Sequence, residues 1–396
     1  MKACLSRRHF LETTAAAGAA SVFGPAGRLF AAQGPALHEP GRRKVIVVQF
    51  GGGLRCSESI DPEGRELIPR LWNEMVPEGA LFTNMRVEHR VVHPNSTGSM
   101  MTGHWEWDDI DWSRPVSHPT IFEIYRRARR APDTSAWAFV YASILAKTGE
   151  SLAGGYGPSF GANIVEPPTI PRASSAEMDR LMSNAAAEGT ELAGREAAAA
   201  CAELARTSSR ISLSGLRSRV ANRFVSEEYE AWKSGKGTTS HDAFLTDGAL
   251  SCMRVFAPDV MAIDYGEIDC AHYGSWSRYV EAIRRTDELT ARVLRAVREL
   301  PAYRGNTLML ILPDHGRELD GNGRWGFVHH SDFYTDRGAD EGCRRVWMLA
   351  IGPGLQAGVK IDRAVPITTV AATALEFLGL DASRGAAESV LGLCGS

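Results

Sequence analysis

The stretch from Leu308 to Leu312 most constrains the fold of this chain, because it is an unbroken apolar run bounded by turn-forming residues. Such a run predicts a strand that is buried on both faces, as in the parallel sheets of α/β proteins. Asp314, His315 and Gly316 follow it directly. In α/β proteins, binding sites form where strands end at their carboxyl side. A carboxylate and a neutral imidazole at that place are good ligands for zinc or a similar divalent ion.

Two further segments carry acids and imidazoles. The strand predicted at 260–263 runs into an acidic segment that contains Asp269 and His272. Closely packed acids repel one another unless a cation lies among them, although a solvated acidic loop would have the same composition. The adjacent His329 and His330 follow the strand at 308–312. One of these two is expected to be a ligand, because neighbours along an extended chain point in opposite directions.

The first predicted strand, Lys44–Phe50, ends in the three glycines Gly51–Gly53. Three glycines let the backbone turn sharply and approach a bound group closely. Arg55 comes just after them and is either a ligand for an anion or a solvated loop residue. The glycines do not form the GxGxxG pattern of dinucleotide-binding proteins.

The segment 93–104 is rich in hydroxyl groups and predicts a turn that leads into a helix. Backbone N–H groups at a helix start bind phosphate or sulfate, which makes Asn95 and the nearby His104 candidates for holding an anion. Ser96 and Thr97 are candidate nucleophiles if a metal ion lowers the pKa of the hydroxyl. Ordinary helix capping by Asn95 or Ser96 is the simpler alternative.

The first 32 residues have the layout of a twin-arginine export signal. Paired arginines in the segment 6–11 precede an Ala- and Gly-rich run from residue 13 to residue 32. This pathway transports folded proteins, so a metal ion could be bound before transport. We therefore expect the twin-arginine export machinery as a partner and a periplasmic or extracellular location.

The remaining chain, 40–396, suits one large α/β domain with an insertion. The segment 174–243 is rich in Ala, Glu and Arg with helical spacing, which predicts a helical insertion over the sheet edge or the site. The predicted fold is a three-layer α/β/α sandwich with a mostly parallel central sheet. The net charge of −3 gives no basic field for nucleic acid. No apolar run after the signal is long enough to span a membrane, and the six cysteines there have no zinc-finger spacing.

In their order, these segments resemble the alkaline phosphatase superfamily, particularly its sulfatase-like and phosphomutase-like branches. The resemblance covers nearly the whole chain after the signal. Asp-His-Gly followed by Gly-Pro-Gly is its most specific part. The segments that carry it, in chain order, are Met101–Gly103, Pro119–Glu123, Asp269 to His272 before a long helix, Asp314–Gly316, Gly352–Gly354 and a closing helix that ends at Leu378–Leu380.

In that superfamily, two divalent ions about 4 Å apart hold the attacking and leaving oxygens of an in-line displacement. A Ser, Thr or modified Cys takes the phosphoryl or sulfuryl group. The resemblance implies one or two ions of zinc, manganese or calcium. It also implies two sets of ligands: Asp269, His272 and one of His329 and His330 for one ion, and Asp314 with His315 for the other.

Three features depart from the family pattern. The family usually has an Asp after the first strand, where this chain has Gly51–Gly53 and where Gln49 is the nearest polar side chain. Counting back from Gly103 to the position of the family's nucleophile gives His93, which is neither a hydroxyl nor a thiol. The spacing of Asp269 and His272 is one residue shorter than in the family. The nucleophile therefore stays open: it is Ser96, Thr97 or water, or it is absent.

The function that these features favour is metal-dependent hydrolysis of small phosphate or sulfate esters by an exported enzyme. The alternative is an exported binding or assembly protein that keeps the fold without catalysis, because the first-strand acid and the nucleophile are missing. A phosphomutase-like phosphotransferase is the lesser alternative. It rests on Thr102–Glu106, which look like part of a phosphopentomutase motif.

Overall fold

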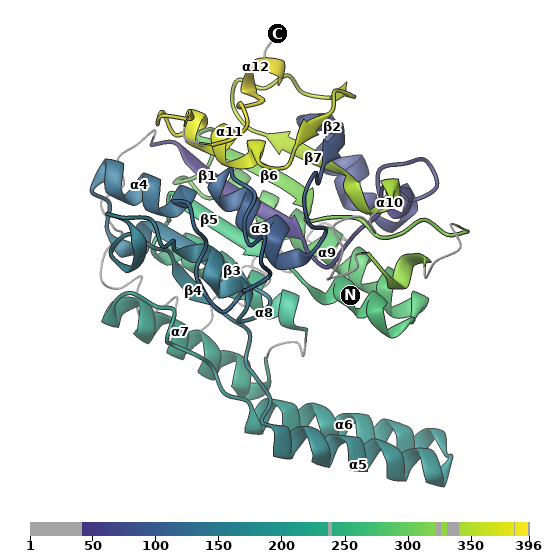
Figure 1. Cartoon of the computed structure of the whole chain (residues 1–396). Coiled ribbons are helices and arrows are strands. Elements are labelled where there is room, and N and C mark those ends of the chain that lie inside the picture. The colour runs from purple at the N-terminus through teal and green to yellow at the C-terminus, as the bar shows by residue number, and fades with distance from the viewer. Residues whose placement is uncertain (1–41, 237–239, 322–325, 331–339, 384, 395–396) are drawn as a thin grey trace, which may run out of the picture.

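The computed structural model describes residues 42–236, 240–321, 326–330, 340–383 and 385–394, so the predicted export signal lies outside the described residues. The described residues form a nine-stranded sheet with the order β4-β3-β5-β1-β6-β7-β2-β8, and β9 pairs with β2 (Figure 1). The strands are β1 (Lys44–Phe50), β2 (Ala80–Arg86), β3 (Ala136–Val140), β4 (Asn163–Val165), β5 (Val260–Asp264), β6 (Thr307–Pro313), β7 (Arg345–Ile351), β8 (Val359–Ile361) and β9 (Val365–Pro366).

The sheet is mostly parallel, as the sequence predicts. The central strand β1 lies between β5 and β6 and runs parallel to both. The strands β3 and β4 continue the parallel arrangement on one side. On the other side β7 is antiparallel to both β6 and β2. The carboxyl ends of β5, β1 and β6 therefore meet at one edge of the sheet, which is where a site is expected.

Helices cover both faces of the sheet because its central strands are apolar on both faces. Val45 and Val47 pack into the core that also contains residues of α3, α4 and α11, whereas Ile46 and Val48 pack into the core of α8 and α9. The predicted three-layer sandwich is therefore confirmed. The helices are α3 (His93–Thr102), α4 (Ile121–Arg129), α5 (Arg172–Glu188), α6 (Glu191–Ser208), α7 (Arg219–Ala231), α8 (His241–Val255), α9 (Trp276–Glu299), α10 (Glu341–Arg344), α11 (Thr369–Phe377) and α12 (Leu391–Cys394).

Helices α5, α6 and α7 fall almost wholly within the segment 174–243. The helices α5 and α6 lie side by side and project away from the sheet (Figure 1). Their contact is built from small side chains, since Ala185, Ala193 and Ala197 form a separate buried cluster. No helix among the described residues is long and apolar enough to cross a membrane.

The carboxylate of Glu123 organises the loops around α4. Its Oε2 accepts a hydrogen bond from the N–H of Thr120 and closes a capping box at the helix start. Its Oε1 accepts from the N–H and hydroxyl of Ser151 and from the N–H of Gly157. Glu123 is fully buried, so these donors have no water to replace a lost acceptor.

We expect Glu123→Gln to lower the free energy of unfolding by about 1–3 kcal/mol. The amide N–H₂ group of glutamine would face N–H groups of the chain and could not accept their hydrogen bonds. Denaturant unfolding monitored by circular dichroism measures this change. Glu196→Gln, at an exposed position of α6, is the matched control and should stay within about 0.5 kcal/mol of the wild type. Equal stability of both variants would contradict the role assigned to Glu123.

Candidate metal centre

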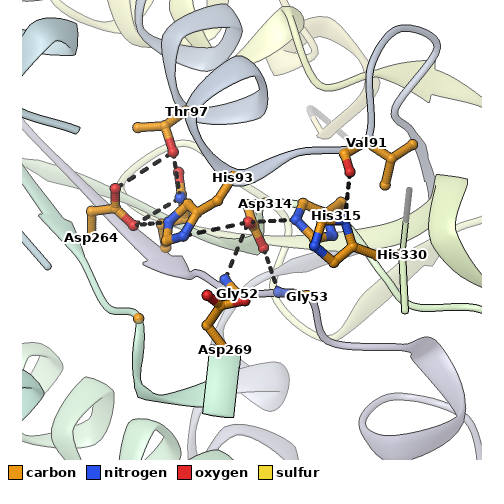
Figure 2. Close-up of polar contacts among 12 residues, drawn as sticks. Gly52, Gly53, Val91, His93, Thr97, Asp264, Asp269, Asp314, His315 and His330 are labelled. Atoms are coloured by element: carbon orange, nitrogen blue, oxygen red, sulfur yellow. Dashed lines mark hydrogen bonds and ion pairs between the residues drawn. The ribbon is translucent and has the colours of Figure 1, made fainter. Parts of the chain in front are cut away.

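Several of the predicted metal ligands lie where β1, β5 and β6 end (Figure 2). Gly51–Gly53 follow β1, Asp264 ends β5, and Asp314 and His315 follow β6. The first turn of α3 brings His93 to the same place, 2.8 Å from Asp264. The topology of the sheet thus joins segments that lie far apart in the chain.

The glycines after β1 hold the carboxylate of Asp314. The N–H groups of Gly52 and Gly53 donate to the Oδ2 and Oδ1 atoms of Asp314 at 3.2 and 3.0 Å. Both glycines have positive φ, 99° and 85°, which other residues adopt only with strain. A Cβ atom on Gly52 would also lie 2.4 Å from the backbone N of Asp269. The close approach predicted for these glycines is therefore toward a carboxylate of the chain itself.

Asp269, His272 and His330 form a group that can hold a metal ion. One ligand atom from each lies within 4.8 Å of the other two, and no other such group of three occurs among the described residues. His272 Nε2 is 3.2 Å from Asp269 Oδ1 and 3.0 Å from His330 Nε2. Ligand atoms around a tetrahedral zinc ion are about 3.4 Å apart, given metal–nitrogen bonds of about 2.0–2.1 Å. The three side chains therefore fit one divalent ion with little movement.

The hydrogen bonds of the two histidines make this fit specific. His272 Nδ1 lies 3.0 Å from the carbonyl of Val328, and His330 Nδ1 lies 2.7 Å from that of Val91. A carbonyl oxygen only accepts, so Nδ1 of each ring is the donor and the Nε2 atoms of the neutral rings hold lone pairs. These lone pairs face each other at 3.0 Å. They repel unless a proton or a metal ion lies between them.

Burial disfavours a proton on His330, whereas a metal ion would satisfy both Nε2 atoms. Burial, with the neighbouring His315 and Arg317, holds the pKa of His330 well below its ordinary value. Burial raises the pKa of Asp269, but hydrogen bonding and charge from His272, with the charges of His93 and Arg317, lower it below the ordinary value. One anionic carboxylate and two neutral imidazoles are the ligand set that zinc and related ions prefer.

Arg317 lies behind this group and was not predicted from the sequence. Its side chain is fully buried, and its guanidinium donates to the carbonyls of Gly52 and Gly53. The same group donates to Asp269 Oδ1 at 3.0 Å. Arg317 therefore ties the glycine turn to the carboxylate of the candidate metal centre. In the sequence it is one arginine among many, two positions after His315, and no pattern marks it.

His93 lies between two carboxylates. Its Nε2 is 2.8 Å from Asp264 Oδ1, and its Nδ1 is 4.0 Å from Asp314 Oδ2 (Figure 2). Burial disfavours the charged ring, but the charges of Asp264 and Asp314 outweigh it and raise the pKa of His93 to about 10. The signal in the sequence was its position, since counting back from Gly103 leads to this residue.

Asp314 and His315 lie together but lack a third ligand of the kind found around Asp269. His315 Nε2 is 3.1 Å from Asp314 Oδ2 and has no hydrogen-bond partner among the described residues. The other ring nitrogen, Nδ1, is 2.7 Å from the carbonyl of Gly316. Burial lowers the pKa of His315 to about 3, so the ring is neutral.

The adjacent histidines point in different directions. His330 lies at the metal group, whereas His329 Nδ1 is 3.0 Å from Glu318 Oε1. This geometry favours His330 as the ligand of the pair.

The candidate nucleophiles lie inside α3 rather than before it. The helix begins at His93, with Val92 as N-cap and no side-chain cap, so the expectation that Asn95 or Ser96 caps it is wrong. Thr97 Oγ1 accepts from Gln49 Nε2 at 2.7 Å, and the Ser96 hydroxyl is buried without a hydrogen-bond partner among the described residues. The geometry places neither hydroxyl in the metal group.

The residues expected to bind an anion have other contacts. All three guanidinium nitrogens of Arg55 have protein partners: Glu58, Asp320 and the carbonyl of Glu318. This geometry disfavours a role for Arg55 in binding substrate.

Asn95 lies in the first turn of α3, and His104 follows that helix. Asn95 Nδ2 donates to the carbonyls of Glu106 and Trp107 at 2.8 and 2.9 Å, so its amide holds the chain beyond the helix. The ring of His104 stacks on that of His118, with centroids 3.9 Å apart. These contacts give both residues structural roles.

Comparisons with known proteins agree with this fold. No family model matches the sequence. A sulfatase of Formosa agariphila is 30% identical over 123 residues, which are 30% of this chain and 22% of that protein, so the match spans about a fifth of the relative. Ps i-CgsB in complex with k-i-k-neocarrahexaose superposes with a TM-score of 0.53 and 13% identity over 88% of this chain and 75% of that chain. The phosphonate monoester hydrolase SpPMH of Silicibacter pomeroyi has a TM-score of 0.51 and 13% identity over 89% and 76%.

The structure thus defines an α/β protein with the fold of known ester hydrolases. In sequence it is a homologue of a sulfatase over part of its length, and its structural neighbours lie in the alkaline phosphatase and sulfatase superfamily. The resemblance stated from the sequence is therefore confirmed at the level of the fold.

Proposed function

We propose that the protein is a metal-dependent hydrolase of sulfate or phosphate esters. The observation that carries the proposal is the pair of imidazole Nε2 atoms that face each other at 3.0 Å beside Asp269. A divalent ion held by Asp269, His272 and His330 would supply Lewis-acid chemistry to the ester. The sulfatase relative and the phosphonate monoester hydrolase neighbour support this class of reaction.

The residues of the chain supply orientation. The carbonyls of Val91 and Val328 fix the two imidazoles, and contacts of this kind keep metal-binding histidines in one tautomer. Arg317 fixes Asp269. Asp269 and His272 are part-exposed, with 42% and 37% of their side chains accessible, so an ester can reach the centre. Because neither Ser96 nor Thr97 belongs to the metal group, we propose water as the attacking group.

Hydrolysis of aryl sulfate and aryl phosphate by apoprotein and by protein loaded with Zn²⁺ or Mn²⁺ tests the proposal. We expect turnover of at least one ester to rise at least about tenfold on loading, because a bound ion would supply Lewis-acid chemistry to the ester. A chelator should reverse the gain. Equal rates with and without metal, for both esters, would reject a metal-dependent hydrolase.

The second candidate is a binding protein without catalysis. Its support is His93, which stands where the family's nucleophile lies and already contacts Asp264. This candidate predicts that the protein binds sulfate or phosphate esters and does not turn them over when metal is loaded. Product formation followed alongside ligand binding by calorimetry separates the two candidates.

We further propose that the protein is exported through the twin-arginine pathway. The support is the sequence of residues 1–32 alone, because they lie outside the described residues. Replacing Arg7 and Arg8 with lysines should leave the protein in the cytoplasmic fraction. Unchanged fractionation of that variant would contradict this route.

A further inference from the structure

The two-ion site implied by the superfamily resemblance does not fit this chain, because His93 occupies part of it. We infer that the imidazole of His93 takes the place of the second divalent ion, so that the protein binds one ion, at Asp269, His272 and His330. This inference rests on the metal centre of the proposed function. It adds the number of ions and the residue that sets this number.

The ring of His93 fills the space beside Gly51. A Cβ atom on Gly51 would lie 2.3 Å from His93 Nε2, 2.4 Å from its Cε1 and 2.2 Å from the carbonyl oxygen of Tyr265. Real Cβ atoms do not approach other atoms so closely. This backbone therefore has no room for an acidic side chain at position 51, because the ring of His93 and the carbonyl of Tyr265 both lie there.

The carboxylates of Asp264 and Asp314 already accept hydrogen bonds from the chain. Asp264 Oδ1 lies 2.8 Å from His93 Nε2 and also accepts from Gln49 Nε2 at 2.8 Å. Asp314 receives the N–H groups of Gly52 and Gly53, one on each oxygen. A second ion would have to compete with these donors. Beside Asp269, by contrast, the Nε2 lone pairs of His272 and His330 face each other and are available to an ion.

Few ligands remain for a second ion. With His93 in place, Asp314 and His315 are the pair left for a second ion, and they form no three-residue group with another acid, cysteine or histidine among the described residues. Two neighbouring side chains hold a divalent ion weakly compared with three or four. The His93 ring instead lies between the two carboxylates, with Nε2 2.8 Å from Asp264 Oδ1 and Nδ1 4.0 Å from Asp314 Oδ2.

The experiment is a metal count that requires no activity. Full-length protein is dialysed against excess Zn²⁺, or against Mn²⁺ in a second series, passed through a desalting column and analysed by mass spectrometry for metal per chain. We expect one ion in the wild type. His330→Ala should bind none, Asp314→Asn should keep one, and His93→Ala, which opens space between Asp264 and Asp314, should bind two.

Each outcome decides between the hypotheses. Two ions in the wild type would overturn the role of His93. The same conclusion would follow from one ion that is lost in Asp314→Asn and kept in His330→Ala. Neither result would contradict a metal-dependent enzyme. No ion in the wild type would overturn the metal centre itself and the proposed function with it. A folded His93→Ala variant with one ion would also contradict the inference. The wild-type count needs no variant to fold, so it tests the inference even if His93→Ala does not.

Discussion

Replacing His330 with alanine should abolish metal binding, whereas replacing the adjacent His329 should not. His330 Nε2 belongs to the group formed with Asp269 and His272, while His329 lies against Glu318. Loss of a residue that merely orients a metal ligand costs about 10–100-fold in affinity. Loss of a ligand itself should therefore cost more than about 100-fold.

Competition with a chromophoric chelator measures this affinity directly, and ester hydrolysis under saturating substrate gives a second readout. His329→Ala is the matched control, because it removes the same side chain one position away. We expect the affinity of this control to remain within about threefold of the wild type. Tighter binding by His330→Ala than by His329→Ala would show that the ligand assignment is reversed.

Much of the fold could be predicted from the sequence because its central strands are buried on both faces. The apolar runs that became β1 and β6 permit little besides a central strand. The strand β2 was missed, because Thr83 and Asn84 interrupt its apolar pattern where it is half-buried. Its place beside β7 depends on long-range pairing, which no local pattern records.

The candidate site could be predicted only in part, because it too depends on contacts between segments that are distant in the chain. Acids and imidazoles after strands could be found one segment at a time, and the sheet brings Asp269 and His330 together. What the sequence could not show is which atoms of neighbouring segments fill the space between them. Arg317 and the carbonyls of Val91 and Val328 act through contacts between segments that are far apart in the chain.

The position of His93 illustrates this limit. Counting along the chain located the residue, but only the packing shows that its ring lies where a side chain at position 51 would have to be. In three dimensions, the residue that looks like a lost nucleophile in the sequence packs against the glycine that follows the first strand.

Arg317 should be the largest single contributor to the stability of the glycine turn. Its Nε lies 3.0 and 3.1 Å from the carbonyls of Gly52 and Gly53, and its Nη1 lies 3.2 Å from that of Phe327. Asp269 keeps 42% of its side chain exposed, so water compensates that carboxylate in part. The buried carbonyl of Gly52 has no such replacement, whereas that of Gly53 also accepts from the Tyr279 hydroxyl at 3.3 Å. An unpaired buried acceptor costs about 1–3 kcal/mol.

We therefore expect Arg317→Ala to lower the free energy of unfolding by about 2–5 kcal/mol, because at least two carbonyls lose their donor. Arg317→Lys should recover less than half of this loss, since a single ammonium cannot reproduce the planar fork of a guanidinium. Denaturant unfolding with a chelator in every sample measures the effect, because bound metal would otherwise add its own stabilisation. Arg278→Ala, at an exposed position of α9, should change the stability by less than about 0.5 kcal/mol. If Arg317→Ala were as stable as this control, the glycine turn would not depend on the guanidinium. The contact between Arg317 and Asp269 would then not contribute to the stability of the fold.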